Sequence, residues 1–536
     1  MKPGLILLCL LVAITVAGCA RRETAVEAGI RTHTLLVGNG SEPVSLDPHL
    51  AKGTTDQCIL ASLLEGLTVL DEETAQPVPG VAERWEVSPD GLVYTFHLRA
   101  NACWSNGDPV TARDFAFAFQ RILTPKLAAH YVYMLWPIKN AKAFNRGQLT
   151  DFSAVGIATP DDGTLRLTLE HPTPYLPALA AHTTWLPVHR ETVGKFGAVD
   201  DRTTTWARPG SYVGNGAFTL VEWRPNVRVV VQKNPHYWDA ARNRIERIVF
   251  FPTEAADVEE RDFRAGQVHV TNTVPASRIA HYRADVPSLL RLDPLMASVY
   301  LSFNVTRPPL NDPKVRRALA LAVDRRAIVE RLFAGSRRPA GCLTPPNCAG
   351  YTARAVVPTD FIAARRLLTE AGFPEGRGLP PLEIQTLSSF EHPKMLEIIQ
   401  EQWRRELGVE STIAQKESGT FFQNQQMLDY SVAVNGWVAD FADPANFLEI
   451  LLSDGGNNWT GWKNADYDRL LAEAARAPDT PHRLERYQEA EALLLREAPI
   501  APLYFNAQSY LIHPAVRGWV PSQLLVRRYQ RVWLAK

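Results

Sequence analysis

The chain has 536 residues, which is more than one compact domain usually holds, so we expect several domains. Lys and Arg (57) balance Asp and Glu (57), so the composition gives no support for a nucleic-acid-binding protein, which needs a basic surface. Hydrophobic residues make up 46% and charged residues 21%, and these ordinary shares exclude a mostly disordered chain.

The N-terminal residues have the pattern of a secretion signal. Lys2 precedes an apolar run at residues 5–16, which is too short to span a bilayer but typical of a signal peptide. Small residues then precede Cys19, as in a bacterial lipobox, although ordinary secretory cleavage would also fit. We predict a signal peptide at 1–18, a lipid such as palmitate on Cys19, and a tether at 19–29. The protein would then be anchored to a membrane, in the periplasm or at the cell surface.

Four cysteines remain in the mature chain besides the lipidated Cys19. An even number suits disulfides in an oxidising compartment. Cys342 and Cys348 flank a short loop with two prolines, which predicts a disulfide between them. Cys58 and Cys103 form the remaining pair, or both are free. A zinc site is less favoured, because no His or second Cys pair lies beside the loop.

The first half of the chain alternates strands with helices. Apolar residues at alternate positions favour half-buried strands, and a helix fits residues 59–67. Thr111 and Asp114 have the spacing of a capping box for a helix that ends at Leu123. The predicted strands are 34–37, 92–98, 165–169, 227–232 and 248–251.

The second half repeats this alternation. Asp312 at the N-cap and Pro313 at the first helical position predict a helix that begins there. Two further helices should end near Gly372 and Gly408, since glycine is common just after a helix. Together with the strands, these helices indicate α/β units. The further helices are 361–370 and 394–407, and the strands are 299–305, 382–386 and 431–434.

The sequence holds no motif that points to an enzyme. It lacks the HExxH, GxxxxGK[ST] and GxSxG patterns, and Gly38-Asn39-Gly40 lacks the third glycine of a dinucleotide-binding loop. A catalytic triad needs no fixed spacing, so this absence is not decisive. We predict no catalytic residue, no metal site and no cofactor.

A set of short sequences, in a fixed order, resembles the oligopeptide-binding proteins of bacterial ABC importers, in the peptide/nickel class (family 5). The resemblance extends over about residues 34–525. The motifs are Glu65-Gly66-Leu67, Pro79-Gly80-Val81-Ala82-Glu83-Arg84-Trp85, Trp104-Ser105-Asn106-Gly107-Asp108, Asn234-Pro235-His236-Tyr237-Trp238, Leu310-Asn311-Asp312-Pro313 and Gly436-Trp437-Val438-Ala439-Asp440.

The resemblance implies an α/β, two-lobed periplasmic-binding-protein clamshell of class II type with an extra inserted α/β domain. Hinge closure around the ligand is the motion expected of such a fold. The hinge would lie near 297–301 and 504–508. The implied parts are a lobe I core at 30–68, 207–296 and 508–536, an inserted domain at 69–206 and a lobe II at 297–507.

The resemblance also implies how a peptide is held. Asp440 would pair with the α-ammonium group, and the strand before it, Gly436, Trp437 and Val438, would bond the peptide main chain. Without the resemblance, the favoured interpretation is that Asp440 and Asp443 cap the turn and the helix before Pro444. The other implied contacts are Lys52, Gly53 and Thr54 along the peptide, Tyr133 of the inserted domain, Tyr504 at the hinge, and His392 near the peptide carboxylate.

The chain departs from the family pattern at the carboxylate end. Val434 and Gln425 stand where peptide-binding relatives have arginines, so this end is rebuilt or unused. Arg337 and Arg338 are either substitutes or exposed loop charges. The inter-lobe disulfide of the family is also absent, and its two positions hold Ala297 and Val438.

These features predict a monomeric binding protein that captures short peptides and delivers them to ABC permease subunits, with no nucleic acid as a partner. The alternative is the same fold with a non-peptide ligand, such as a murein peptide, nickel chelate, haem or oligosaccharide. A chaperone or signalling role without transport also stays open.

Overall fold

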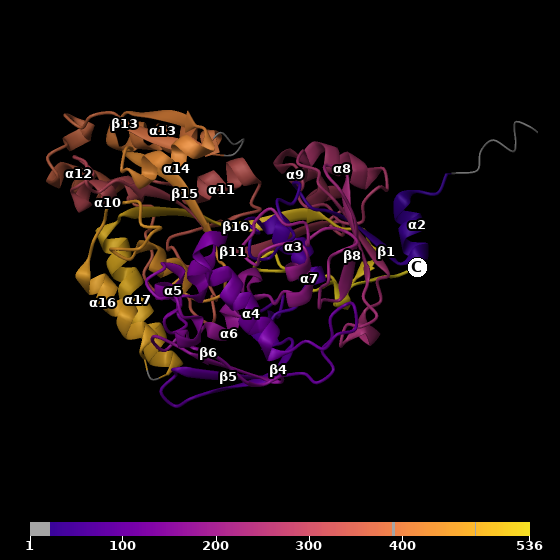
Figure 1. The fold of residues 1–536 in the computed structure, drawn as a ribbon. Helices are drawn as coiled ribbons and strands as arrows, with labels where there is room; N and C mark the ends of the chain where they lie inside the picture. The colour runs from indigo at the N-terminus through magenta and orange to yellow at the C-terminus, as the bar shows by residue number, and fades with distance from the viewer. Residues whose placement is uncertain (1–21, 388–391, 478) are drawn as a thin grey trace, which may run out of the picture.

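A computed structural model describes residues 22–387, 392–477 and 479–536. The predicted signal peptide and the lipid site at Cys19 lie outside these residues. Figure 1 shows one group of elements around β1 and β8, a second around β4, β5 and β6, and a third around β13 and β15, with β11 and β16 running between them. Several sheets and surrounding helices give the mixed α/β architecture that the sequence predicts.

The first sheet joins segments that are far apart in the sequence. Its order is β1-β10-β9-β8, and β1 pairs in parallel with β10 while the other pairs are antiparallel. Three consecutive buried valines hold β9 in the core, which is why this strand lacks the usual alternation. The strands are Thr34–Gly38 (β1), Phe218–Arg224 (β8), Arg228–Lys233 (β9) and Arg247–Phe251 (β10). The helices nearby are Ala25–Thr32 (α2), Thr54–Leu63 (α3), Ala256–Arg264 (α8) and Ala276–Asp285 (α9).

The second sheet is antiparallel, with the order β4-β5-β7-β6. Helix α4 packs beside it and begins as predicted, since the Thr111 backbone N–H donates to the Asp114 carboxylate at 2.8 Å. The rings of Phe119 and Trp185 meet edge to face in the core that this sheet shares with the first one. The elements are Ala82–Val87 (β4), Val93–Leu98 (β5), Ile157–Asp161 (β6), Thr164–Thr168 (β7), Ala112–Leu123 (α4), Ala141–Asn145 (α5), Leu176–Leu179 (α6) and Arg190–Lys195 (α7), with a small hairpin of Thr68–Leu70 (β2) and Pro77–Pro79 (β3).

The third sheet has six strands in the order β12-β16-β11-β15-β13-β14. Its strands are Leu290–Phe303 (β11), Arg338–Pro339 (β12), Leu382–Leu387 (β13), Ser411–Lys416 (β14), Val432–Val438 (β15) and Ile500–Leu511 (β16). Its helices are Pro313–Leu321 (α10), Arg325–Phe333 (α11), Phe361–Glu370 (α12), His392–Leu407 (α13), Ser418–Gln426 (α14), Ala445–Leu448 (α15), Ala465–Ala475 (α16) and Thr480–Glu497 (α17). A last pair, Val516–Arg517 (β17) and Trp533–Leu534 (β18), lies near the C-terminus.

Strands β11 and β16 pair over almost their whole length and connect two hydrophobic cores. At one end, Leu290 opposes Leu511 in a cluster with residues of α8 and α9. At the other end, Leu301 opposes Ala501 in a cluster with residues of α10, α11 and α13. The register shifts between Pro294 and Ser298, where a proline removes one donor of the ladder. The paired strands therefore join two separately packed bodies.

Most elements lie where the sequence predicts them. Helix α12 has the predicted bounds, and Asp312 caps α10 by accepting the Lys314 N–H at 2.8 Å. Helix α3 is shifted toward the N-terminus, because the chain turns extended at Leu64 and enters the hairpin. Strand β11 begins nine residues before the predicted residue 299, and the added part contains Pro294, a residue that is uncommon inside strands.

The predicted disulfides are not shown by this structure, in which Cys342 and Cys348 are free, and Cys58 and Cys103 are free as in the alternative left open for them. The Cys342 thiol donates to the Thr344 carbonyl at 3.4 Å instead of meeting Cys348. The Cys58 thiol donates to the Leu525 carbonyl at 3.5 Å. A backbone carbonyl thus accepts the hydrogen bond of each of these two thiols, Cys342 and Cys58.

Candidate ligand-binding site

Strand β15 presents a free edge. On one side it pairs with β11, from Val432 opposite Phe303 to Val438 opposite Ala297. On its other side β13 pairs only with Val432 and Ala433. Within the described residues, this side of the strand is therefore unpaired along residues 434–438, where backbone donors and acceptors can take another extended chain.

The register decides which backbone groups point outward. The Ala439 N–H donates to the Met296 carbonyl at 2.8 Å, so the pair Ala297–Val438 is one of the non-hydrogen-bonded pairs. Because the direction of the groups alternates along an antiparallel strand, the N–H and C=O of Gly436 and Val438 point away from β11. Both residues are exposed, which leaves these groups accessible.

Asp440 follows β15 directly and is held by Asn446. The Asn446 Oδ1 accepts the Asp440 backbone N–H at 3.1 Å and the Trp437 Nε1–H at 2.8 Å. Burial raises the pKa of the Asp440 carboxyl to about 6, against a smaller lowering by a side-chain hydrogen bond with Asn446 that is separate from the backbone bond. Among the described residues, Asp440 makes no ion pair. Its half-buried carboxylate therefore has room for a cation.

Asp443 has a different and structural role. Its carboxylate forms a buried ion pair with Arg483 and also accepts the Ala445 N–H at 2.9 Å, at the start of α15. Asp443 thus caps the helix, whereas no helix end or cation is bonded to the Asp440 carboxylate in the described chain. Of the two aspartates that the sequence leaves equivalent, only Asp440 is available to a ligand.

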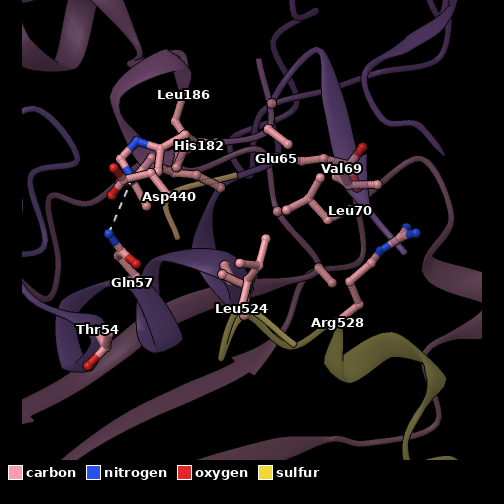
Figure 2. Close-up of a pocket in the computed structure, with 18 of the residues that line it drawn as sticks. Thr54, Gln57, Glu65, Val69, Leu70, His182, Leu186, Asp440, Leu524 and Arg528 are labelled. Atoms are coloured by element: carbon pink, nitrogen blue, oxygen red, sulfur yellow. Dashed lines mark hydrogen bonds between the residues drawn. The ribbon is translucent and has the colours of Figure 1, made fainter. Parts of the chain in front are cut away.

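Three cavities adjoin this strand, and a fourth shares a wall with one of them. We call the four cavities A, B, C and D. Asp440 lines both A and B, Tyr133 lines B and C, and Trp437 lines B and D. The main lining residues are Thr54, Leu64, Glu65, Leu70, His182, Leu524 and Arg528 in cavity A (Figure 2), Tyr175, Phe441 and Glu449 in B, Trp136, His171 and Asp468 in C, and Tyr300, Phe421 and Trp459 in D. Together they form a cleft between the first two sheets and the third.

The structure brings together most of the predicted contact residues, and they line the cleft as follows. Lys52, Thr54, Val438 and Asp440 line cavity A, Tyr133 and Trp437 line B, and Gly436 and His392 line D. Gly53 lies between Lys52 and Thr54 as the N-cap of α3.

Tyr504 lies elsewhere. It is 2% exposed and packs against Phe333 in the core below the third sheet, with ring centroids 4.9 Å apart. It lines none of the four cavities.

The far end of the cleft has little positive charge. Val434 and His392 line cavity D, and the described lining of this cavity holds no Lys or Arg. Gln425 is buried and accepts a hydrogen bond from the Asn435 amide at 2.6 Å. Arg337 lies over Phe333 and donates to Ser509 at 3.1 Å, away from the four cavities. Burial lowers the pKa of His392, which favours the neutral imidazole.

Sequence reasoning missed several residues of the site. For Asn446 a local sequence signal does exist, because this residue follows Asp443 and Pro444, which the sequence already identifies as the start of a helix. Glu449 lines cavities B and C, and burial raises its pKa to about 7. Arg528 reaches cavity A from the C-terminal segment, 88 residues beyond Asp440, so no local pattern could place it there.

The comparisons with known proteins agree with this geometry. Residues 76–459 match the family described as "Bacterial extracellular solute-binding proteins, family 5 Middle". The periplasmic oligopeptide-binding protein OppA of Salmonella typhimurium is 35% identical, over 98% of this chain and 97% of the relative. The chain belongs to family 5 of the bacterial extracellular solute-binding proteins.

Solved structures of family 5 proteins have the same fold. The murein tripeptide binding protein MppA of Escherichia coli has a TM-score of 0.80 at 30% identity, over 94% of this chain and 98% of that one. The OppA of Haemophilus influenzae in complex with the peptide RPPGFSPFR has a TM-score of 0.77 at 27% identity, over 94% of this chain and 99% of that one. The predicted oligopeptide-binding-protein fold is therefore confirmed.

Membership of family 5 also confirms the class of function. The family binds solutes outside the cell, and its members are binding components, not enzymes. Among the described residues no group of His, Cys, Asp and Glu could hold a metal ion, and no helix is long and apolar enough to cross a bilayer.

Proposed function

We propose that this protein captures short peptides in the cleft, with the α-ammonium group at Asp440 and the main chain added as a strand to the free edge of β15. The observation that carries this proposal is the open edge at residues 434–438, which leads directly to a carboxylate without a cation. Names of relatives support it, since one is described as oligopeptide-binding, one was solved in complex with a peptide and one is described as binding a murein tripeptide.

The contacts suit a ligand of variable sequence. The outward N–H and C=O groups of Gly436 and Val438 would pair with a peptide main chain, which is the same for every sequence. Lys52 and Thr54 line the opposite wall of cavity A and would contact the same chain from the first lobe. Side chains would point into cavities B and D, whose aromatic walls accept many shapes.

Closure of the two lobes would bring β15 toward the wall of the cleft that Lys52 and Thr54 line. In this proposal, lobe I comprises 30–68, 207–296 and 508–536, the inserted domain 69–206, and lobe II 297–507. Strands β11 and β16 would act as the hinge, because they join two separately packed cores and carry a register shift at Pro294–Ser298. The loaded form would then dock on an ABC permease in the membrane.

The N-terminal segment would supply the anchor. After removal of residues 1–18, a lipid on Cys19 would hold the protein at the membrane next to its permease. Residues 19–29 would serve as the tether. Metabolic labelling with palmitate, compared between the natural protein and Cys19→Ser, tests this part separately from ligand binding.

Native mass spectrometry of the gently purified protein tests the ligand class. We expect a mixed population of short peptides. One discrete non-peptide mass would contradict the proposal and favour the alternative ligands of this fold, such as a nickel chelate or an oligosaccharide.

Calorimetry with one tripeptide, free or N-acetylated, tests the anchor. The substitution Asp440→Asn should weaken binding of the free peptide by about 2 kcal/mol or more, the scale for truncating one member of a buried charge pair. Asp454→Asn is a matched control, since Asp454 is exposed and pairs with Lys463 outside the cleft. Equal affinity of the free and acetylated peptides would remove Asp440 from the site.

A further inference from the structure

Cavity A extends beyond the amine anchor. In Figure 2, Asp440 and His182 lie on one side of it and Arg528 on the other, with Leu524 between them. A peptide that is anchored at Asp440 and lies along β15 would occupy only the side of cavity A next to Asp440 and Val438 before it continues into cavities B and D. The side of the chamber next to Arg528 is left for another group.

The walls of this chamber are mainly apolar. Leu64, Val69, Leu70, Leu186, Leu524 and Val526 contribute side chains to it. His182 also faces the chamber, and burial lowers its pKa to about 4, so it is neutral at physiological pH. Apolar walls of this kind stabilise a hydrocarbon group by removing it from water.

Arg528 brings a positive charge to the side of the chamber opposite Asp440. Its Nε is buried and has no hydrogen-bond acceptor, and its guanidinium forms no ion pair within the described residues. Its backbone N–H donates to Glu72 and its backbone C=O accepts from the Arg531 N–H, whereas its side chain makes no hydrogen bond within the described residues. A buried N–H without an acceptor is costly, and a ligand oxygen would satisfy it.

The nearby acid does not take this role. Glu65 also lines cavity A, but its carboxylate accepts hydrogen bonds from the Tyr237 hydroxyl and from Trp238 Nε1. Burial raises the pKa of Glu65, against the opposing effect of the Arg528 charge. Glu65 therefore offsets the positive charge of Arg528 without bonding to it, and the N–H donors of Arg528 stay available. Lys52, the other cation of the lining, is exposed at the mouth.

We propose that cavity A binds an apolar group that ends in a carboxylate, with the hydrocarbon part against Leu64, Leu70 and Leu524 and the carboxylate on the guanidinium of Arg528. Two sources share this chemistry. The group is either a free medium-chain carboxylate or the first side chain of a bound peptide. The site is distinct from the main-chain and amine contacts on β15, so it stands even if peptide capture fails.

Calorimetry with octanoate, and with octanamide as its neutral counterpart, tests the free source. Octanoate should bind the natural protein more tightly than octanamide, and Arg528→Gln should abolish that difference by weakening octanoate roughly ten- to hundredfold, as for a hydrogen bond to a charged group. Arg531→Gln is the matched control, because Arg531 pairs with the exposed side of Asp71 outside the cavity and should leave both affinities unchanged.

A pair of tripeptides tests the bound source. One begins with 2-aminosuberic acid, whose hydrocarbon side chain ends in a carboxylate, and the other begins with norleucine. The acidic peptide should lose its advantage in Arg528→Gln, while a plain trialanine should keep its affinity for that variant. If trialanine binding is lost in Asp440→Asn but kept in Arg528→Gln, the result bears on the peptide proposal and not on cavity A.

Leu524→Phe provides a second variant that narrows the chamber without changing its charge. It should weaken both octanoate and the aminosuberyl peptide, and thermal unfolding checks that each variant folds. The proposal is overturned if neither acidic probe prefers the natural protein over Arg528→Gln. It is also overturned if Lys52→Gln, and not Arg528→Gln, removes the preference for the carboxylate.

Discussion

The side-chain oxygen of Asn446 accepts the backbone N–H of Asp440 at 3.1 Å. The same oxygen accepts the Trp437 indole N–H. One amide therefore fixes both the backbone just after β15 and the Trp437 ring, which lines cavities B and D. Asn446 itself lines cavity B and is 7% exposed. It is a positioning residue for the proposed amine anchor.

Replacing Asn446 by Ala should weaken peptide binding roughly tenfold, because two buried donors lose their acceptor and the anchor loses its fixed position. A side-chain hydrogen bond with Asn446 also lowers the pKa of the Asp440 carboxyl, so its loss should move the pH midpoint of binding upward. Calorimetry over a pH series measures both effects. Asn424→Ala, at a residue that bonds Gln385 outside the cavities, is the control. An unchanged midpoint would limit Asn446 to a structural role.

Peptide affinity should depend on pH through Asp440. The carboxyl titrates with a pKa of about 6, and only its ionised form attracts an ammonium group. Affinity should therefore fall as the pH decreases below about 6, by up to about tenfold per pH unit. Nearby Tyr131 and Tyr133 stay neutral, since burial and the Asp440 charge raise their pKa values. In Asp440→Asn the affinity should be low and nearly independent of pH between 5 and 7.

The same pKa shift makes the opposite prediction for stability without ligand. The pKa of Asp440 is raised in the folded state, so its contribution to stability is present below the unfolded pKa and is lost as the pH rises through about 6. Asp440→Asn should thus melt at a higher temperature than the natural protein at pH 8, and the two should converge near pH 4. Thermal unfolding of ligand-free protein at both pH values provides the measurement. A lower melting temperature at pH 8 would contradict the desolvation of Asp440.

Local sequence signals were sufficient for most of the fold. Capping residues placed the starts of α4 and α10, and Gly372 marked the end of α12, because these signals act within one turn of helix. The long strand β11 was only half predicted, since its first half contains Pro294 and is stabilised by pairing with β16, about 200 residues away. Pairing of this kind leaves no local trace.

For the site, the resemblance supplied what physics alone could not. Asp440 and Asp443 are three residues apart and chemically alike, and only the position of Arg483, on α17, separates their roles. Spacing likewise suggested a bond between Cys342 and Cys348, but the direction of each thiol depends on the packing of the loop. Arg528 was missed, because it enters cavity A from a segment with no motif.

Ala297 and Val438 lie opposite each other in a non-hydrogen-bonded pair of β11 and β15. Such pairs bring the Cα atoms to about 4.5 Å, close enough for a disulfide. The double variant Ala297→Cys, Val438→Cys should therefore form this bond on oxidation and gain about 2–4 kcal/mol in free energy of unfolding, while it keeps its peptide affinity. Mass mapping and denaturant unfolding, with and without reductant, check both expectations. Free thiols at 297 and 438 after oxidation would contradict the register.

The four cysteines of the described residues, Cys58, Cys103, Cys342 and Cys348, should be free thiols of different reactivity. Burial raises the pKa of Cys342 and Cys348 well above the usual range of a thiol, and it raises that of Cys58 to about 11, so few thiolates are available there at neutral pH. Cys103 is half-buried and should be alkylated first in the native protein. After unfolding without reductant, all four should react, and peptide mapping identifies the modified sites. A peptide pair linked through Cys342 and Cys348 would show that the secreted protein closes the loop that the structure leaves open.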